Sequence, residues 1–195
     1  MTKDEISLRT KNMLAESLKK SMEKKPFEKI TVTEILKDSN ITRSTFYYHF
    51  EDIYSLMIWM FENECVQLME KSKDFYTWSD GIELVLNYVR RNYEVCICAL
   101  DSSSVGREYL KRLLFDSSLQ IMLKFINSLE IPARDEDKRF IGAFYTRAMV
   151  SELICWMNEG MKYSTSEMID LYEMAMGGAV KNALLKSTQK SHKQK

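Results

Sequence analysis

The side chains best suited to bind another molecule lie close together, between residues 31 and 50. Residues 42–50 are Thr-Arg-Ser-Thr-Phe-Tyr-Tyr-His-Phe, which combines hydroxyl groups, aromatic rings and one guanidinium. Hydroxyl groups bind phosphate oxygens, arginine can form two hydrogen bonds to a guanine edge, and threonine or tyrosine can contact a thymine methyl group. The segment therefore favours contact with the groove and phosphates of DNA.

The residues just before this segment predict the helix and turn that must position it. Thr31 and Glu34 form a capping-box pattern, in which the hydroxyl accepts from the backbone at Glu34 and the carboxylate reaches back. Asn40 suits a left-handed turn conformation, so the helix should end near residues 39–40. The sequence thus predicts a short second helix followed by a tight turn.

A third helix is expected over residues 43–49, with Thr42 as its cap. Successive residues of a helix are rotated by about 100°, so Phe46 and Phe50 should share the face that packs on the core. Tyr48 then points away from the core. Two phenylalanines can hold so short a helix in place and leave its polar face free, which is the geometry of a helix-turn-helix.

The rest of the chain predicts an all-α fold. Prolines and glycines are few, at two and six, and long stretches repeat apolar residues at spacings of three and four. We expect an N-terminal three-helix helix-turn-helix domain over residues 1–52. A C-terminal helical domain for ligand binding and dimerisation should follow over 53–186, and a basic, flexible tail over 187–195.

The expected helices have recognisable start and stop signals. Besides the second and third helices, the expected segments are 8–23, a helix capped by Asp52, a helix capped by Ser79, and the ranges 93–100, 105–129, 135–158 and 164–185. Gly160 is a fitting C-terminal stop for the helix over 135–158. Ser164 and Glu167 form a second capping box, which should start the final helix.

Charge and hydropathy limit the partners of the chain. Basic and acidic residues balance at 28 each, so the formal net charge is zero and any DNA-binding surface must be local. The first residues lack an apolar signal segment, and no run approaches the roughly 20 apolar residues of a membrane span. We therefore expect a soluble, cytoplasmic protein with no membrane partner.

The cysteines and histidines do not predict catalysis. The four cysteines, which are Cys65, Cys96, Cys98 and Cys155, are expected to be reduced and buried because no secretion signal precedes them. The two histidines have no cysteine or carboxylate partner at metal-ligand spacing. With no nucleophile–base pair and no phosphate loop, the sequence predicts no enzyme, no cofactor and no metal.

Residues 42–52 resemble the helix-turn-helix motif of the TetR/AcrR family of one-component regulators. Residues 140–167, which include Trp-Met-Asn-Glu-Gly at 156–160, are also similar to the C-terminal domain of a low-GC Gram-positive subgroup. The resemblance implies a homodimer that binds a partly palindromic operator in double-stranded DNA, usually as a repressor. It also implies that a small-molecule effector, bound in the C-terminal domain, releases the DNA.

The same resemblance assigns contacts to individual residues of the motif. It implies phosphate contacts from Thr33, Tyr48 and His49, and groove contacts from Arg43, Ser44, Thr45 and Tyr47. Family members often carry a lysine or similar donor directly after the position of Asp52, where this chain has Ile53. Without that donor, binding should depend more on the nearby lysines, which are Lys24, Lys25, Lys29 and Lys37.

The last two expected helices suggest a dimer interface. The candidate interface residues are Phe140, Phe144, Ala148, Met168, Tyr172, Ala175, Ala179 and Ala183. Gly177 and Gly178 fall within the expected final helix, where glycine costs roughly 1 kcal/mol relative to alanine. Close approach of a neighbouring helix would offset that cost. The alternative is that these residues pack only within one subunit.

The sequence identifies an effector pocket least well. Aromatic and sulfur-containing side chains of the central helices are candidates for its lining, namely Tyr88, Tyr93, Cys96, Tyr109, Met122, Phe144, Tyr145 and Trp156, although each is equally compatible with ordinary core packing. Two rival functions stay open at this stage. One is a helix-turn-helix co-activator whose C-terminal domain docks a partner protein. The other is a helical ligand-binding or enzymatic protein whose helix-turn-helix is vestigial.

Overall fold

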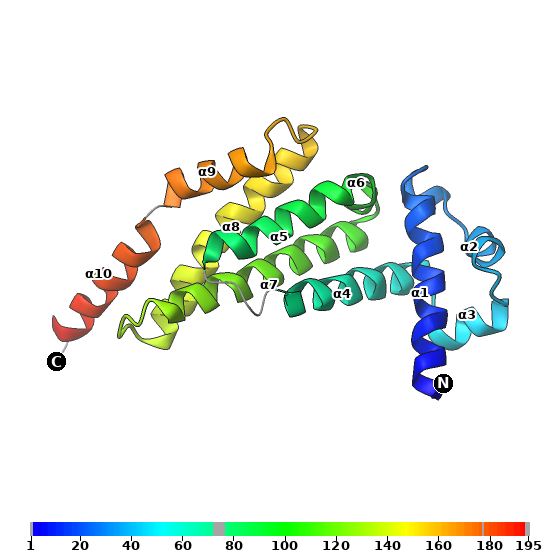
Figure 1. Cartoon of the computed structure of the whole chain (residues 1–195), viewed down its shortest axis with the longest axis horizontal. Coiled ribbons are helices and arrows are strands. Elements are labelled where there is room, and N and C mark those ends of the chain that lie inside the picture. The colour runs from blue at the N-terminus through cyan, green and yellow to red at the C-terminus, as the bar shows by residue number, and fades with distance from the viewer. Residues whose placement is uncertain (1, 72–76, 177, 194–195) are drawn as a thin grey trace. The chain divides into compact units, whose positions relative to one another are not determined.

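The computed structural model describes residues 2–71, 77–176 and 178–193, and every regular element among them is helical (Figure 1). The prediction of an all-α fold is confirmed. The elements are α1 (Lys3–Met22), the 3₁₀ helix η1 (Phe27–Lys29), α2 (Val32–Ser39), α3 (Arg43–His49), α4 (Ile53–Lys71), α5 (Trp78–Arg91), α6 (Tyr93–Asp101), α7 (Ser104–Ser128), α8 (Asp135–Asn158), α9 (Thr165–Met176) and α10 (Ala179–Lys193).

The helices form two compact units whose limits differ from the expected domain boundaries. The first unit comprises residues 1–67 and 92–113, and the second comprises 68–91 and 114–195. The expected boundary lies at residue 52, but most of α4, all of α6 and the start of α7 belong to the first unit. The reason is packing, because α1 contacts α6 as well as α2. Apolar periodicity within single helices does not reveal which helices pair.

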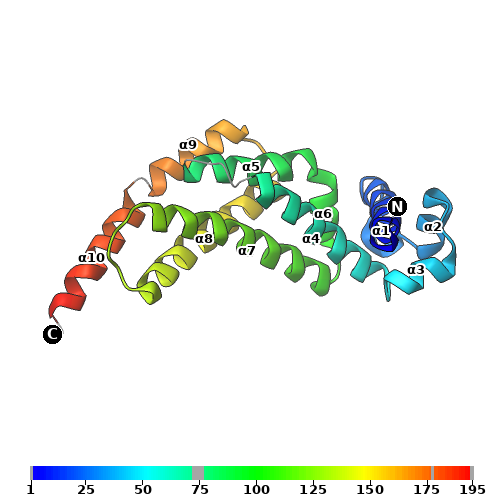
Figure 2. The ribbon, with the colours of Figure 1, turned by 60° about the horizontal axis from the view of Figure 1, so that its bottom comes forward.

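The core of the first unit is built around α1, α2 and α3 (Figure 2). Leu14 and Leu18 of α1, Ile35 of α2 and Phe46 of α3 have no exposed surface. The buried Ser17 hydroxyl donates to the backbone carbonyl of Ile35 at 3.1 Å, which fixes α2 along α1. The short second and third helices are thus held by burial and by a hydrogen bond to the long first helix.

The second unit contains two helix pairs, α5 with α9 and α8 with α10. Val85 and Leu86 of α5 and Leu153 of α8 are almost fully buried. The Tyr172 hydroxyl of α9 donates to the Met149 carbonyl of α8 at 2.8 Å, and burial raises the pKa of the Tyr172 hydroxyl. Tyr172 therefore connects α9 to α8 within one subunit.

Two helix starts differ from expectation, and capping explains both. α1 begins at Lys3 rather than Leu8, because Thr2 and Glu5 form a capping box that the later-starting apolar stripe does not reveal. α5 begins at Trp78, because the Thr77 hydroxyl accepts from the Asp80 N–H at 3.2 Å. The expected cap, Ser79, lies inside the helix.

The prediction of one continuous final helix is wrong. α9 ends at Met176 and α10 begins at Ala179. Gly178 has a φ of 73°, a left-handed conformation that glycine adopts readily and that interrupts a right-handed helix. Gly177 lies outside the described residues. α10 continues to Lys193, so the segment expected to be a flexible tail is helical to that residue.

The other helix signals are confirmed. α8 spans Asp135–Asn158 as expected, and Gly160 after it has a φ of 76°. Ser164 caps α9, since its Oγ accepts from the Glu167 N–H at 3.2 Å while the Glu167 carboxylate accepts from the Ser164 N–H at 2.7 Å. These local patterns needed no tertiary information.

Candidate nucleic-acid interface

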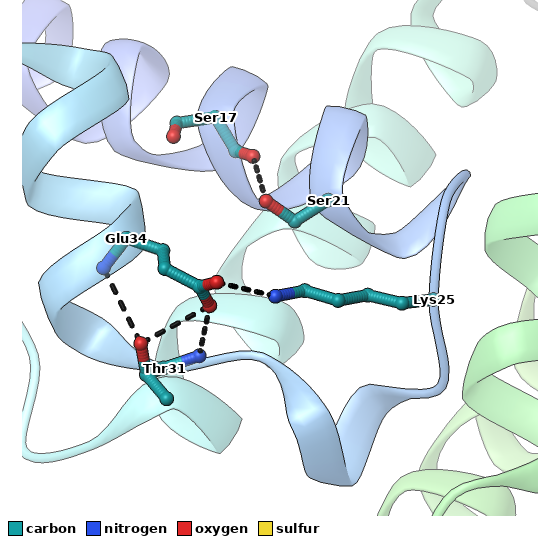
Figure 3. Close-up of polar contacts among 5 residues, drawn as sticks. All are labelled: Ser17, Ser21, Lys25, Thr31 and Glu34. Atoms are coloured by element: carbon teal, nitrogen blue, oxygen red, sulfur yellow. Dashed lines mark hydrogen bonds and ion pairs between the residues drawn. The ribbon is translucent and has the colours of Figure 1, made fainter.

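The N-terminus of α2 is fixed by the predicted capping box (Figure 3). The Thr31 Oγ1 accepts from the Glu34 N–H at 3.4 Å, and the Glu34 carboxylate accepts from the Thr31 N–H at 3.0 Å. The Lys25 ammonium joins this network at 2.6 Å from the Glu34 carboxylate and, with Thr31, holds the pKa of that carboxyl below its ordinary value. The loop after α1 is therefore tied to the start of α2.

The turn between α2 and α3 has the expected left-handed residue. Asn40 has a φ of 54°, and the Ile41 N–H donates to the Leu36 carbonyl at 3.2 Å. The Ser39 hydroxyl donates to the Ile35 carbonyl at 2.7 Å and so closes the end of α2. This turn sets the direction in which α3 leaves α2.

Two phenylalanines anchor α3 as predicted. Phe46 is fully buried and Phe50 is 5% exposed, with their ring centroids 6.0 Å apart. On the opposite side Tyr48 is 71% exposed, while Tyr47, on the flank of the helix, is 49% exposed. Large aromatic side chains so exposed to water favour a binding surface.

The remaining candidate side chains of α3 gather around Tyr47 and Thr42. The Arg43 guanidinium lies 5.7 Å from the centroid of the Tyr47 ring, within the range of a cation–π contact. The Thr42 hydroxyl lies 3.1 Å from the Ser44 hydroxyl and 2.8 Å from the Thr45 hydroxyl, and it also caps the helix by accepting from the Thr45 N–H. The hydroxyl groups thus form one cluster at the start of α3.

The structure places the predicted contact residues of α2 in solvent. Thr33, in the first turn of α2, and Lys37, in its last turn, are exposed. α2 and α3 contact each other, so these side chains and the exposed face of α3 belong to one compact unit. Ile53, at the first position of α4, is half-buried.

Lys11 is a residue that the sequence analysis missed. Its ammonium lies 5.9 Å from the Phe50 ring centroid and 5.6 Å from the Trp59 ring centroid. Desolvation and the Lys11 charge lower the pKa of His49, the last residue of α3. No local pattern relates Lys11 to residues 38 or more positions later, so only the fold brings them together.

Comparison with known proteins identifies the family. Residues 76–178, more than half of the chain, match the family model TetR_C_8, which is described as the C-terminal region of transcriptional regulators. The chain belongs to the TetR family of transcriptional regulators. The predicted resemblance is confirmed, and this match falls on the C-terminal region, where the sequence motif is less specific than in residues 42–52.

Similar proteins agree with the TetR assignment. The HTH-type dhaKLM operon transcriptional activator DhaS of Lactococcus lactis is 31% identical over 86 residues, which are 44% of this chain and 46% of DhaS. The chain thus matches about half the length of this curated relative. The identity of 31% over that stretch supports the family assignment. The activator function is that of DhaS.

Two solved structures share the fold of this TetR-family chain. One is titled dihydroxyacetone kinase operon activator DhaS, with a TM-score of 0.67 at 23% identity, covering 91% of this chain and 94% of that one. The other is a TetR transcriptional regulator from Streptococcus agalactiae, with a TM-score of 0.63 at 19% identity, covering 89% and 96%. At such identities the comparison shows the fold alone.

The candidate effector-lining residues are divided between the two units. Tyr93, Cys96 and Tyr109 belong to the first unit, and the others belong to the second. A cavity of about 10 Å³ lies among α5, α7, α8 and α9, with room for about one water molecule, and none of the eight candidates lines it. Cys96, Met122 and Trp156 are core residues, whereas Phe144 is 59% exposed.

The candidate dimer residues separate into three groups by exposure. Met168 and Tyr172 are buried in their own subunit, at 4% and 6% exposed, and so have little surface to offer a partner. Ala179 and Ala183 of α10 are half-buried. The exposed members are Phe140, Phe144 and Ala148 of α8 and Ala175 of α9.

Burial opposes ionisation of two of the four cysteine thiols. Burial raises the pKa of the Cys96 thiol to about 12 and that of Cys98 to about 11, so both stay protonated at neutral pH. Cys155 is exposed on α8, contrary to the expectation that all four are buried. Within the described ranges, no helix is long and apolar enough to span a membrane, and no cluster of side chains could hold a metal ion.

Proposed function

We propose that this chain is a homodimeric, sequence-specific regulator that binds a partly palindromic operator through α3. The observation that carries the proposal is the exposed face of α3, where Arg43 and the two tyrosines stand clear of a helix anchored by buried Phe46 and Phe50. Arg43 has the chemistry to bind a guanine edge, and the exposed tyrosine hydroxyls can bind phosphates. Thr33 at the start of α2 adds a hydroxyl and the partial positive charge of a helix N-terminus.

A homodimer would match a partly palindromic operator. Two-fold symmetry places two identical helices on half-sites about one DNA turn, or ~34–36 Å, apart. The exposed apolar residues of α8 supply a surface for self-association. Phe140 and Phe144 are 71% and 59% exposed, with stacked rings 6.5 Å apart.

A titration against DNA tests the proposal. The purified protein is titrated with DNA from upstream of its own gene, with random DNA as competitor, over a series of salt concentrations. Selective binding that falls steeply with salt supports the proposed function, since a protein that neutralises Z phosphates shows a slope of about −0.9Z in log affinity against log salt. If neither this DNA nor a genome-wide selection yields a preferred sequence, the proposed function is wrong.

Transcription from the operator would be regulated in one of two ways. In the first, the protein is a repressor that a small molecule bound in the second unit releases from DNA. In the second, the protein is a co-activator whose second unit docks a partner protein. The description of the relative DhaS as an activator favours the second scheme.

A transcription assay on the operator separates the two schemes. Repression predicts that deleting the gene raises expression from the operator, and that a small molecule restores this level in the wild type. Activation through a partner predicts that deletion lowers expression. In that case small molecules alone leave the protein–DNA complex intact.

A further inference from the structure

The Lys11 ammonium is held in place without being neutralised. Two aromatic rings, those of Phe50 and Trp59, lie within 6 Å of it. Other lysines of the same unit are paired with carboxylates at 2.6 Å, Lys19 with Glu64 and Lys25 with Glu34. Across residues 2–71, 77–176 and 178–193, no carboxylate is within ion-pair distance of Lys11. A ring face orients a cation but leaves its full charge available to an anion.

The position of Lys11 relates it to α3. Its ammonium lies 5.9 Å from the ring of Phe50, the residue that directly follows α3, and its charge contributes to the lowered pKa of His49 in the last turn of that helix. The His49 ring in turn lies 4.9 Å from the ring of Tyr48, the most exposed aromatic residue of the proposed DNA-binding face. The first residue of α4, Ile53, brings no charge to this end of α3. Lys11 therefore supplies a cation at this end of α3.

We propose that Lys11 is a DNA-phosphate contact, positioned by the Phe50 and Trp59 rings beside the C-terminal end of α3. The proposal rests on the proposed function and adds a residue of α1 to its binding surface. An ammonium is a compact point charge that suits a phosphate oxygen. Because phosphate contacts carry no sequence information, Lys11 should contribute to affinity and salt dependence but not to sequence preference.

Three variants test this contact in the full-length protein. Lys11→Gln removes the charge at similar length, and Lys11→Arg keeps it. Lys162→Gln is the matched control, because it removes one lysine charge from an exposed position in the other unit. Each protein is titrated with the operator and with random DNA over the same salt series as the wild type.

Lys11→Gln should weaken binding to the operator and to random DNA by the same factor. Its salt slope should fall by about 0.9 for each phosphate that the variant no longer neutralises, hence by about 1.8 in a homodimer. Lys11→Arg and Lys162→Gln should keep the wild-type slope. If Lys11→Gln unfolds, Lys11→Met, which keeps an apolar stem on the two rings, takes its place.

The outcomes separate this contact from the proposed function. Selective wild-type binding with an unchanged Lys11→Gln slope overturns the Lys11 contact and leaves the proposed function standing. Loss of selectivity in Lys11→Gln without a change in slope also overturns it, because base contacts would then be affected. If the wild type binds no DNA at any salt concentration, both proposals are wrong. A rise in the pKa of His49 in DNA-free Lys11→Gln, followed by NMR, should confirm that the two side chains are neighbours.

Discussion

Arg43 and Tyr48 are both exposed on α3, about 140° apart around the helix, and they are suited to different tasks. Arg43 has a planar guanidinium that can form two hydrogen bonds to guanine, and its position over the Tyr47 ring limits its freedom before DNA arrives. Tyr48 has a single hydroxyl at the end of a ring that is 71% exposed. We therefore expect base recognition from the first and phosphate contact from the second.

Substitution of these two residues should separate specificity from affinity. Arg43→Ala should relax the preference at one operator position by about 1–3 kcal/mol, because alanine cannot form the two hydrogen bonds to the base. Tyr48→Phe should weaken binding to all sequences by a similar factor. Competition titrations with single-base operator variants measure both effects. An equal decrease of affinity for every sequence in Arg43→Ala would contradict its assignment to base recognition.

His49 should make stability depend on pH. Its folded-state pKa is lowered by desolvation and by Lys11, so between the folded and unfolded pKa values the unfolded chain binds more protons. Stability is therefore lost as pH falls below the ordinary histidine pKa of 6.5. The decrease in melting temperature between about pH 7.5 and about pH 5.5 should be smaller in His49→Gln than in the wild type. Lys11→Gln should reduce this decrease in melting temperature only in part, because the desolvation of His49 persists. Equal decreases in all three proteins would refute this role of His49.

At the scale of elements, local signals predicted most of the helix starts. Thr31 with Glu34 and Ser164 with Glu167 gave the starts of α2 and α9 correctly, because a capping box depends only on neighbours in sequence. Where two hydroxyl residues compete, as Thr77 and Ser79 do, the pattern alone does not decide between them. The interruption at Gly178 was missed because glycine is compatible with either a helix or its end.

The capping box of α2 should determine the local stability of the DNA-binding unit. Thr31→Val removes the hydroxyl that accepts from the Glu34 N–H, which should cost about 0.5–2 kcal/mol. Hydrogen exchange of the α2 amides measures this local destabilisation. Thr10→Val is a matched control, because the Thr10 hydroxyl only bonds to the Ile6 carbonyl within α1. If α2 exchanges at the same rate in both variants, the capping box is not what holds this helix.

For the whole molecule, the exposure of the residues of α3 was more predictable than the tertiary organisation. Exposure of Tyr47 and Tyr48 and burial of Phe46 follow from rotation along one helix, and the structure agrees. The pairing of α6 with α1 and the burial of Met168 depend on contacts between distant segments. A single amino-acid sequence does not indicate which distant segments will contact each other. For the same reason, the two packed units do not divide at the expected boundary, residue 52.

Self-association through α8 can be tested with a charged substitution. Phe140, Phe144, Ala148 and Cys155 are all exposed and fall within an arc of about 80° on α8. Phe144→Asp should convert the dimer to a monomer, because it buries an unpaired charge in the proposed interface. The mass from sedimentation and the affinity for a two-half-site operator should both fall. Val105→Asp, at an exposed apolar position of the first unit, is the control.

The Cys155 thiol offers an independent measure of the same interface. Alkylation should be slower in the wild-type dimer than in Phe144→Asp, because the partner would cover this exposed residue. Equal rates in the two proteins, together with equal masses, would rule out this face of α8 as the dimer interface.

The hydroxyl cluster at the start of α3 can adapt its hydrogen bonds to different groups on DNA. In the contacts of Thr42 with Ser44 and Thr45, either oxygen can be the donor. Each hydroxyl carries one hydrogen and rotates about its C–O bond, so the direction of these hydrogen bonds can reverse while the oxygen atoms stay in place. The same oxygens can therefore present a hydrogen to a phosphate or a lone pair to a base amino group. Rotation of the hydroxyl hydrogens alone would let the rigid start of α3 bind either a hydrogen-bond acceptor or a hydrogen-bond donor on DNA.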